Sequence, residues 1–279
     1  MRSCTQPIKR SKTESMVFRF MGDSTSLTYV GHATVLIEMN GVRVLTDPLL
    51  RDRAGFLRRC AASIDPKSYQ DIDAIIISHL HMDHLDLPSL RLMDHATRLI
   101  VPRGAAHILQ NVGFHQIEEV EAGDSIRIGS AIIRSTYAEH VRSRYPLGPI
   151  AECVGYVIRG SHKIYFAGDT DLFQGMTDIA NDLDVALLPV WGWGPTIRGL
   201  HMNPYRAAQA LTLLQPRMAI PVHWGTMAPF GLAWMKPPFL SRPPQDFVRC
   251  AARLAPQVKV NVLPPGSSLT VNGGSLDES

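Results

Sequence analysis

The sequence predicts an α/β fold, with β-sheet in the interior and helices on the outside. Short runs rich in β-branched and aromatic residues recur along the chain, and helical segments fit between several of them. Hydrophobic residues make up 45% of the 279 residues, which is ample for a packed core. The chain is therefore globular, with layers of sheet and helix.

The expected strands begin with a hairpin. Thr28–Ile37 and Val42–Thr46 read as strands on either side of Asn40-Gly41, a dipeptide that tolerates the positive φ values of a tight turn. Further strands are expected at Ala74–Ser78, Leu99–Pro102, Ile126–Ser135, Val154–Arg159, Lys163–Ala167, Val185–Pro189, Met218–Pro221 and Val258–Val262.

Helices are expected over residues 103–112, 203–215 and 243–254. The second of these has the best-defined start, because Asn203 can cap it and Pro204 then occupies its first helical position. We expect residues 1–26, which are polar and aperiodic, to form a flexible N-terminal arm. Residues 27–279 show no internal repeat and are expected to form one domain.

Long irregular connections interrupt this pattern. Residues 47–72 are rich in Arg, whereas residues 191–202 and 224–242 are rich in Trp, Met, Pro and Gly. Loops of this length inside a compact domain tend to be functional or disordered. Because these loops carry large aromatic residues, we expect them to form the walls of a substrate site.

Composition excludes several classes of protein. The formal net charge of +3 is well short of the basic excess expected of a protein that binds nucleic acid through its phosphates. The four cysteines are scattered and form no CxxC pair, so we expect reduced thiols and a cytoplasmic location. The sequence has neither the apolar stretch of a secretory signal nor a run long enough to span a membrane.

The stretch SHLHMDHLD, residues 78–86, follows the apolar run Ala74–Ile77 and carries the main chemical signal. Imidazole and carboxylate groups are the ligands that zinc and similar divalent cations take. His79 and His81 alternate on one face of an extended segment, and Asp83 and His84 follow as the chain turns. The alternative is a polar cap of solvated histidines, which is common for a lone HxH but not for the full pattern.

A centre with two cations needs about six or seven protein donors, so other strand ends must supply the rest. His140 follows the strand that ends near Tyr137, Asp169 lies in YFAGDTD, and His223 lies in IPVHWGT. Each residue alone is ambiguous, because a single histidine at a strand end is more often structural. Together they supply the missing donors.

At this point the sequence resembles the metallo-β-lactamase superfamily. The resemblance starts from HLHMDHLD and extends through YVGHATVLIEMNGVRVLTDPLL, FAGDTD, LLPVWGWG, HMNPYRAAQA and VHWGT, over roughly residues 27–235. These phrases are most similar to the branch that contains N-acylphosphatidylethanolamine-hydrolysing phospholipase D and the ascorbate-6-phosphate lactonase-like proteins. The resemblance implies a four-layer αββα sandwich, with two mixed β-sheets flanked by helices and metals at the sheet edges.

The resemblance also implies a ligand set for two divalent metal ions. His79, His81 and His140 would hold one ion, Asp83, His84 and His223 would hold the second, and Asp169 would bridge both. A carboxylate has two oxygens and can join two cations, whereas a neutral imidazole binds one. Zinc is the first choice, with manganese or iron as alternatives.

Other residues are assigned roles around these ligands. Asp83 would also act catalytically by orienting a water molecule, and His201 matches a branch position that faces the site, with capping of the following helix as its alternative. Asp47, Asp86 and Thr226 are candidates for orienting the imidazoles, and His32 is interpreted as a core histidine. The substrate-binding candidates, which read equally well as solvated charge or core, are Arg142, Arg144, Trp191, Trp193 and Trp224.

The predicted function is therefore that of a binuclear metal-dependent hydrolase with a metal-bound hydroxide as nucleophile. Its substrate would be a phosphodiester or related anionic ester, small or phospholipid-like, and peripheral contact with a membrane would fit the apolar loops. The first alternative is a lactonase that acts on a sugar-phosphate or acyl lactone. The second is a metal-stabilised binding module without activity.

Overall fold

The computed structural model describes residues 24–197, 199 and 201–272. Residues 1–23 of the expected N-terminal arm lie outside this range. The remaining end of that arm, Thr25 and Ser26, already belongs to the first strand. Regular structure thus begins before the expected start of the domain at Leu27.

The first large sheet has seven strands in the order β17-β1-β2-β3-β6-β7-β8. Neighbours from β17 to β3 pair antiparallel, and β6, β7 and β8 continue parallel to β3. The strands are β1 (Thr25–Gly31), β2 (Thr34–Met39), β3 (Val42–Thr46), β6 (Ala74–Ile76), β7 (Arg98–Pro102), β8 (Gln116–Val120) and β17 (Ser267–Val271).

The second large sheet also has seven strands, in the order β16-β14-β13-β12-β11-β10-β9. Strands β9 to β12 form an antiparallel meander, whereas β12, β13, β14 and β16 are parallel. The strands are β9 (Ser125–Ile128), β10 (Ala131–Tyr137), β11 (Val154–Arg159), β12 (Lys163–Phe166), β13 (Val185–Pro189), β14 (Met218–Val222) and β16 (Lys259–Val260).

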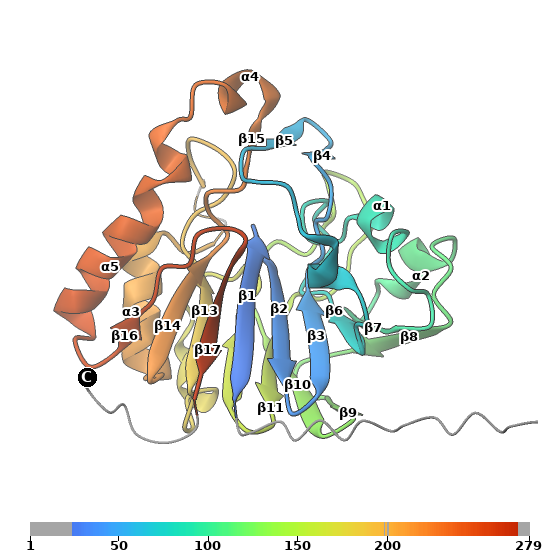
Figure 1. The fold of residues 1–279 in the computed structure, drawn as a ribbon, viewed down its shortest axis with the longest axis horizontal. Helices are drawn as coiled ribbons and strands as arrows, with labels where there is room; N and C mark the ends of the chain where they lie inside the picture. The colour runs from blue at the N-terminus through green and yellow to red at the C-terminus, as the bar shows by residue number, and fades with distance from the viewer. Residues whose placement is uncertain (1–23, 198, 200, 273–279) are drawn as a thin grey trace, which may run out of the picture.

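A third, small sheet joins two segments that the sequence presents as irregular. Its strands β15 (Met227–Pro229), β5 (Leu57–Arg59) and β4 (Arg53–Ala54) pair antiparallel. The Arg-rich connection after β3 and the loop after β14 therefore pack together above the large sheets (Figure 1).

The helices are short except for two. They are α1 (Leu87–Leu90), α2 (Ala106–Leu109), α3 (Pro204–Leu214), α4 (Phe230–Ala233) and α5 (Arg242–Leu254), with 3-10 turns η1 (Pro66–Tyr69), η2 (Gln174–Asp178) and η3 (Pro238–Leu240). Within the described ranges, no helix has both the length and the apolar character needed to cross a bilayer.

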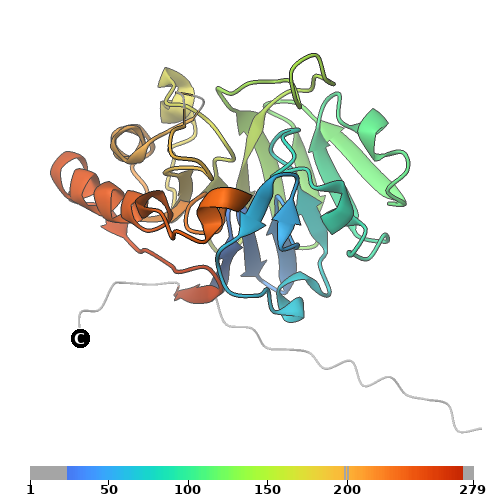
Figure 2. The same cartoon turned by 90° about the horizontal axis from the view of Figure 1, so that it is seen from above.

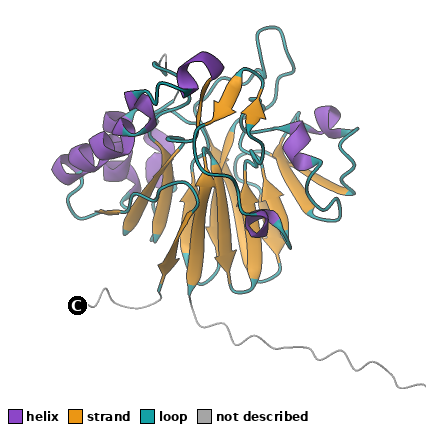
Figure 3. Ribbon diagram, turned by 45° about the horizontal axis from the view of Figure 1, so that its top comes forward, coloured by secondary structure: helices purple, strands orange, loops and turns teal. Residues whose placement is uncertain are grey.

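The two large sheets pack face to face, with helices at both sides. Figure 2 shows the blue strands β1 to β3 of the first sheet and the yellow-green strands β10 and β11 of the second as separate layers. In Figure 3 the helices form one group beside the second sheet, α3 and α5, and another beside the first, α1 and α2. The predicted four-layer αββα architecture is confirmed.

Burial follows these layers. Ile37 and Ile76 of the first sheet share one buried core with Ile133 and Tyr156 of the second. A second core contains Leu45, Ile75 and Leu99 from the opposite face of the first sheet, packed with Leu90 and Leu109 of the short helices. Alternate residues of a strand face opposite sides of a sheet, so one strand such as β6 serves both cores.

Three expected elements differ from the structure. The single strand expected at Thr28–Ile37 is two antiparallel strands, β1 and β2, joined by a tight turn at His32-Ala33. The run Ile126–Ser135 likewise divides at Gly129, whose φ is 53°, into β9 and β10. The helix expected over 103–112 is only one turn long, Ala106–Leu109.

Other local predictions are confirmed. Asn40 and Gly41 have φ values of 51° and 78° and join β2 to β3 as a hairpin. Asn203 caps α3 by accepting a hydrogen bond from the Arg206 backbone N–H at 2.9 Å, with Pro204 in the first turn. Both follow from backbone preferences of single residues, which a sequence displays directly.

Strand direction brings distant residues to one edge of the sandwich. In the first sheet β1, β3 and β6 run in the same direction, and in the second sheet β10, β12 and β14 do so. Segments that leave the carboxyl ends of these strands therefore emerge together. The histidines and aspartates of the sequence motifs lie in those segments.

The core predicts a clear contrast between two leucines. Leu187 of β13 is fully buried, whereas Leu254 at the end of α5 is 37% exposed. We expect Leu187→Ala to lower the free energy of unfolding by about 2–5 kcal/mol, because it leaves a cavity. Leu254→Ala should change it by less than about 0.5 kcal/mol. Denaturant unfolding measures both, and equal effects would contradict the layer assignment.

Candidate metal centre

The segment after β6 forms a compact loop, Ser78 to Asp86, that we call the metal loop. His84 N–H and Leu85 N–H both donate to the His81 carbonyl, at 3.0 and 2.8 Å, which closes a tight turn. The Arg144 guanidinium donates to the carbonyls of Leu80 and Leu85, at 2.5 and 3.1 Å. The loop is thereby fixed at both ends of the turn.

Three imidazoles form the first ligand group. His79 Nε2 lies 2.9 Å from His81 Nδ1, and His140 Nε2 lies 3.2 Å from the same atom. His79 is buried, and the other two are half-buried. His140, from the segment after β10, thus meets the metal loop, as the sequence predicts.

A second group lies directly beside the first, with the rings of His79 and His84 4.1 Å apart. In this group His84 Nε2 lies 3.0 Å from His223 Nε2. Asp83 Oδ2 lies 3.9 and 3.8 Å from these two nitrogens, and only 13% of its side chain is exposed. The segment after β14 therefore also reaches the metal loop.

Asp169, which follows β12, faces the second group with both carboxylate oxygens. Its Oδ2 lies 3.3 Å from His84 Nε2, and its Oδ1 lies 3.4 Å from His223 Nε2. His201 Nε2 lies 3.8 Å from Asp169 Oδ2, and the His201 side chain is buried against the cluster. His201 therefore faces the site, while the capping of α3 falls to Asn203.

These donor atoms fit divalent cations. Two nitrogen ligands at 2.0–2.1 Å from one tetrahedral ion lie about 3.3 Å apart, close to the separations within each group. Asp169 Oδ1 is buried and has no hydrogen-bond partner in the part of the chain that the structure describes. A buried carboxylate oxygen without a partner is costly, and a cation would satisfy it.

Charge in the cluster supports the same conclusion. Burial lowers the pKa of His79 well below its usual range and that of His81 to about 4, so both are neutral, as ligands must be. Burial disfavours ionisation of Asp83 and Asp169, but the surrounding imidazoles hold both pKa values well below their usual range. Burial opposes protonation of His84, but Asp169, Asp47 and Asp83 raise its pKa well above its usual range. A bound cation would displace this proton and balance the carboxylates in its place.

Asp47 orients imidazoles of both groups. This fully buried carboxylate accepts hydrogen bonds from His84 Nδ1 at 2.7 Å and from the Ser78 backbone N–H and hydroxyl at 2.7 and 2.6 Å. The Ser78 hydroxyl in turn lies 2.9 Å from His79 Nδ1. Because their Nδ1 atoms donate to these partners, His79 and His84 present Nε2 to the cluster.

The metal loop and the Asp169 segment touch at a glycine. Gly168 has a φ of 61°, and a Cβ at this position would lie 2.5 Å from the Ser78 Cβ. Only glycine permits both the conformation and the close approach. Gly168 therefore sets how near Asp169 comes to His79 and His84.

A family model for the beta-lactamase superfamily domain matches residues 42–224. The chain belongs to this superfamily. The matched range includes Asp47 and the complete predicted ligand set, from His79 to His223.

Several superfamily relatives resemble the chain over most of its length. A metal-dependent hydrolase of Methanopyrus kandleri is 32% identical over 249 residues, which cover 87% of this chain and 98% of the relative. An uncharacterized protein of Mycobacterium tuberculosis is 30% identical over 237 residues, or 78% of this chain. The chain spans about 64% of the length of that mycobacterial relative.

A solved superfamily structure has the same architecture. The metallo hydrolase Igni18 of the hyperthermophilic archaeon Ignicoccus hospitalis matches with a TM-score of 0.69 and 25% identity. The match covers 90% of this chain and all of that one. The superfamily fold predicted from the metal motif is therefore confirmed.

His32 is buried and hydrogen-bonded, as expected of a core histidine, but its position in the fold differs from the prediction. It lies in the turn between β1 and β2, with a φ of 57°, and not within a core strand. Its Nε2 lies 2.8 Å from Asp83 Oδ2, and its carbonyl accepts the His223 backbone N–H at 2.7 Å. Gly31 before it was the available signal, since a glycine inside an apparent strand often marks a bulge or a close approach.

Two candidates for orienting imidazoles have other roles. Asp86 accepts two hydrogen bonds from Arg51, at 2.8 and 2.6 Å, and caps α1 through the Ser89 N–H at 3.0 Å. Thr226 Oγ1 accepts the His32 backbone N–H at 2.7 Å. Both residues therefore fix backbone segments next to the site and do not bind its imidazoles.

The two arginine candidates are engaged by other groups of the protein. Arg144 is occupied by the carbonyls of the metal loop, and burial lowers its pKa. Arg142 is largely exposed and pairs with Glu152 at 3.5 Å. For Arg144 the geometry indicates a structural role, because a guanidinium engaged in this way is not available to a phosphate.

The tryptophan candidates differ among themselves. Trp224 is only 8% exposed, and its indole N–H donates to the Pro221 carbonyl at 2.9 Å, so it belongs to the core. Trp191 is half-buried, and its carbonyl accepts His223 Nδ1 at 2.7 Å. Trp193 packs edge-on against exposed Phe56, with ring centroids 5.1 Å apart. Of the three, Trp193 is best placed to line a substrate.

The role of Asp47 generates a prediction. Asp47→Asn removes the charge that fixes two imidazoles, and we expect it to weaken cation affinity by about 10–100-fold. Asp182→Asn is the matched control, because Asp182 is an exposed turn residue with a φ of 52°, which asparagine tolerates. Competition with a chromogenic chelator measures both affinities. An unchanged affinity in a folded Asp47→Asn protein would contradict the assignment.

Proposed function

We propose that the protein is a metal-dependent hydrolase with two divalent cations, zinc first among the candidates. His79, His81 and His140 would hold one ion, Asp83, His84 and His223 the other, and Asp169 would join them. The convergence of four strand-end segments on two adjacent ligand groups carries this proposal. When bound, such ions supply an activated water molecule and stabilise negative charge that develops on the substrate.

The charge of the loaded site supports an anionic substrate. Two divalent cations carry four positive charges, and Asp83, Asp169 and a metal-bound hydroxide would offset three of them, which leaves about one positive charge. A phosphodiester or a related anionic ester would be attracted to such a site. The proposal agrees with the names of relatives described as metal-dependent hydrolases.

The chain's own residues would divide the work around the reacting atoms. Asp83, held through Oδ2 by His32, would orient the attacking water and accept its proton. His201, buried beside Asp169, would contact the substrate on the side of the leaving group. Neither role needs a serine or cysteine nucleophile.

The surface beside the metal loop supports a substrate with an apolar portion. Phe56 and Trp193 form an aromatic pair there, and the side chain of Met82 in the metal loop lies near Gly55. Beyond them Phe230, Trp234 and Met235 are 48%, 72% and 74% exposed. These residues would contact a lipid-like group of the substrate.

Two arginines accompany this apolar surface. Arg53 lies over the Phe230 ring, and Arg58 lies over the rings of Phe230 and Trp234, with 5.2–5.9 Å between the guanidinium carbon and the ring centroids. The other two arginines of the connection are engaged elsewhere, Arg51 with Asp86 and Arg59 with the Val30 carbonyl. The Phe230–Met235 segment and these two arginines form what we call the aromatic rim.

Activity provides the first test. Zinc-loaded protein should hydrolyse bis-p-nitrophenyl phosphate, and Asp83→Ala should lower kcat/KM by at least about 10²-fold, because it removes both a ligand and the proton acceptor. Asp94→Ala, remote from the cluster, should retain activity. The measurement is the release of p-nitrophenol at matched metal content.

The same assay decides between the alternatives. If the protein hydrolyses lactones but neither phosphodiesters nor phospholipids, it is a lactonase and not a phosphodiesterase. If the metal-loaded protein hydrolyses neither lactones nor phosphodiesters, and its binding properties do not depend on Asp83, only the non-catalytic binding module remains.

The aromatic rim provides a second test. Vesicles that contain phosphatidylglycerol should bind the protein and shift its tryptophan emission to the blue, because Trp234 would enter the interface. Trp234→Ala should weaken binding by about tenfold, whereas Tyr205→Ala, which removes an exposed aromatic residue of α3, should not. Equal binding by both variants would rule out the rim as a membrane contact.

A further inference from the structure

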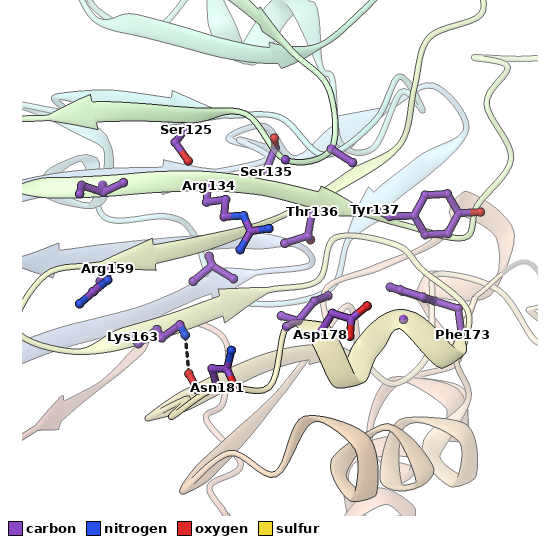
Figure 4. Close-up of a pocket in the computed structure, with 16 residues that line it drawn as sticks. Ser125, Arg134, Ser135, Thr136, Tyr137, Arg159, Lys163, Phe173, Asp178 and Asn181 are labelled. Atoms are coloured by element: carbon purple, nitrogen blue, oxygen red, sulfur yellow. Dashed lines mark hydrogen bonds between the residues drawn. The ribbon is translucent and has the colours of Figure 1, made fainter.

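A cavity of about 680 Å³ lies on the second sheet, outside the metal centre. Its floor comes from strands β9 to β12, and its wall comes from η2 and the residues after it. Figure 4 shows Tyr137 and Phe173 at one end of this groove and Arg159 and Lys163 at the other. A cavity of this size suits a ligand the size of a nucleotide or drug molecule.

Three cations lie together on the floor of the groove. Arg159 of β11 pairs directly with Lys163 of β12, and Arg134 of β10 pairs with Val157, two residues from Arg159 on β11. Like charges on directly opposed residues of neighbouring strands destabilise a sheet. Their clustering therefore needs a compensating partner.

The protein supplies little such compensation. Within residues 24–197, 199 and 201–272, none of the three cationic side chains forms an ion pair with a carboxylate. Lys163 Nζ donates instead to the Asn181 carbonyl. Asp178 is the one acidic residue among those that line the groove. The groove floor thus retains a net positive charge.

The other end of the groove is aromatic. The rings of Tyr137 and Phe173 pack edge to face with centroids 5.1 Å apart, and Tyr137 is 50% exposed. Val157, directly opposite Arg134, adds apolar surface between the two ends, whereas Ile132 lies opposite Arg159 at the cationic end. Tyr137 lies three residues beyond Arg134 on β10, a span of about 10 Å at 3.3 Å per residue.

We propose that this groove binds a phosphorylated small molecule with an aromatic or apolar body. Arg134, Arg159 and Lys163 would contact the phosphoryl groups, since guanidinium groups match phosphate oxygens well. The body of the ligand would lie along Val157 toward Tyr137 and Phe173. A bounded cavity, rather than an open basic surface, favours a small molecule over a nucleic acid strand.

This site is separate from the metal centre, because no residue that lines it belongs to either ligand group. Its two aromatic residues nevertheless come from the segments that lead to the centre. Tyr137 precedes His140, and Phe173 follows Asp169. The proposal does not depend on the hydrolase activity, and either one can fail without the other.

Calorimetric titration of the metal-loaded protein with ADP, inorganic pyrophosphate and adenosine tests the proposal. We expect ADP to bind most tightly, pyrophosphate more weakly and adenosine weakest of all. Arg134→Ala and Arg159→Ala should each weaken the binding of ADP and of pyrophosphate at least tenfold. Phe173→Ala should weaken the binding of ADP several-fold and leave the binding of pyrophosphate unchanged. This difference separates the contribution of the Phe173 ring from that of the contacts to phosphate.

Arg253→Ala is the matched control, because it removes an exposed arginine of α5 that is far from the groove in sequence. The Arg253→Ala protein should bind all three probes as tightly as the unchanged protein does. ADP binding that survives both Arg134→Ala and Arg159→Ala would place the ligand outside the groove and overturn the proposal. Absence of binding at millimolar ADP would overturn it too. If an RNA oligomer binds more tightly than ADP, and this binding depends on the groove residues, the ligand of the groove is a nucleic acid and not a small molecule.

Discussion

Buried negative charge is the constraint on which the rest of the structure depends. Asp47 and Asp169 are almost completely buried, Asp83 is nearly so, and all three lie within one cluster of imidazoles. Burying carboxylates is costly unless they are hydrogen-bonded or paired with positive charge. Asp47 is satisfied by Ser78 and His84, whereas one oxygen of Asp169 has no hydrogen bond from the described residues. The fold thus concentrates negative charge that a proton on His84 balances in part and that bound cations would balance in its place.

The surroundings of the cluster hold it in shape before any cation binds. Arg144 fixes the metal loop, Gly168 lets the Asp169 segment approach it, and the turn at His32 is hydrogen-bonded to the segment that carries His223. Each of these contacts joins one of the large sheets to the other or to a loop between them. The ligand geometry therefore depends on the packing of the whole sandwich, and a destabilised core would be expected to impair metal binding as well.

The sequence revealed the cluster well because its signals are local. HLHMDHLD places four donor residues within six positions, and strand-end residues such as His140 and His223 could be added because each follows an apolar run. The role of His32 could not be predicted in the same way, since its turn lies within what reads as a continuous strand. Arg144 and Trp224 were assigned to substrate because composition does not tell whether a side chain on a loop points outward or back into the fold. The pairing of β5 with β15 was also missed, because it joins residues more than 160 positions apart.

The central claim is that two cations lie side by side between these ligands. Anomalous diffraction from crystals grown with zinc tests it directly. Two peaks about 3.5–4 Å apart are expected, one against His79, His81 and His140 and the other against Asp83, His84 and His223. A single peak, or peaks away from these residues, would contradict the account.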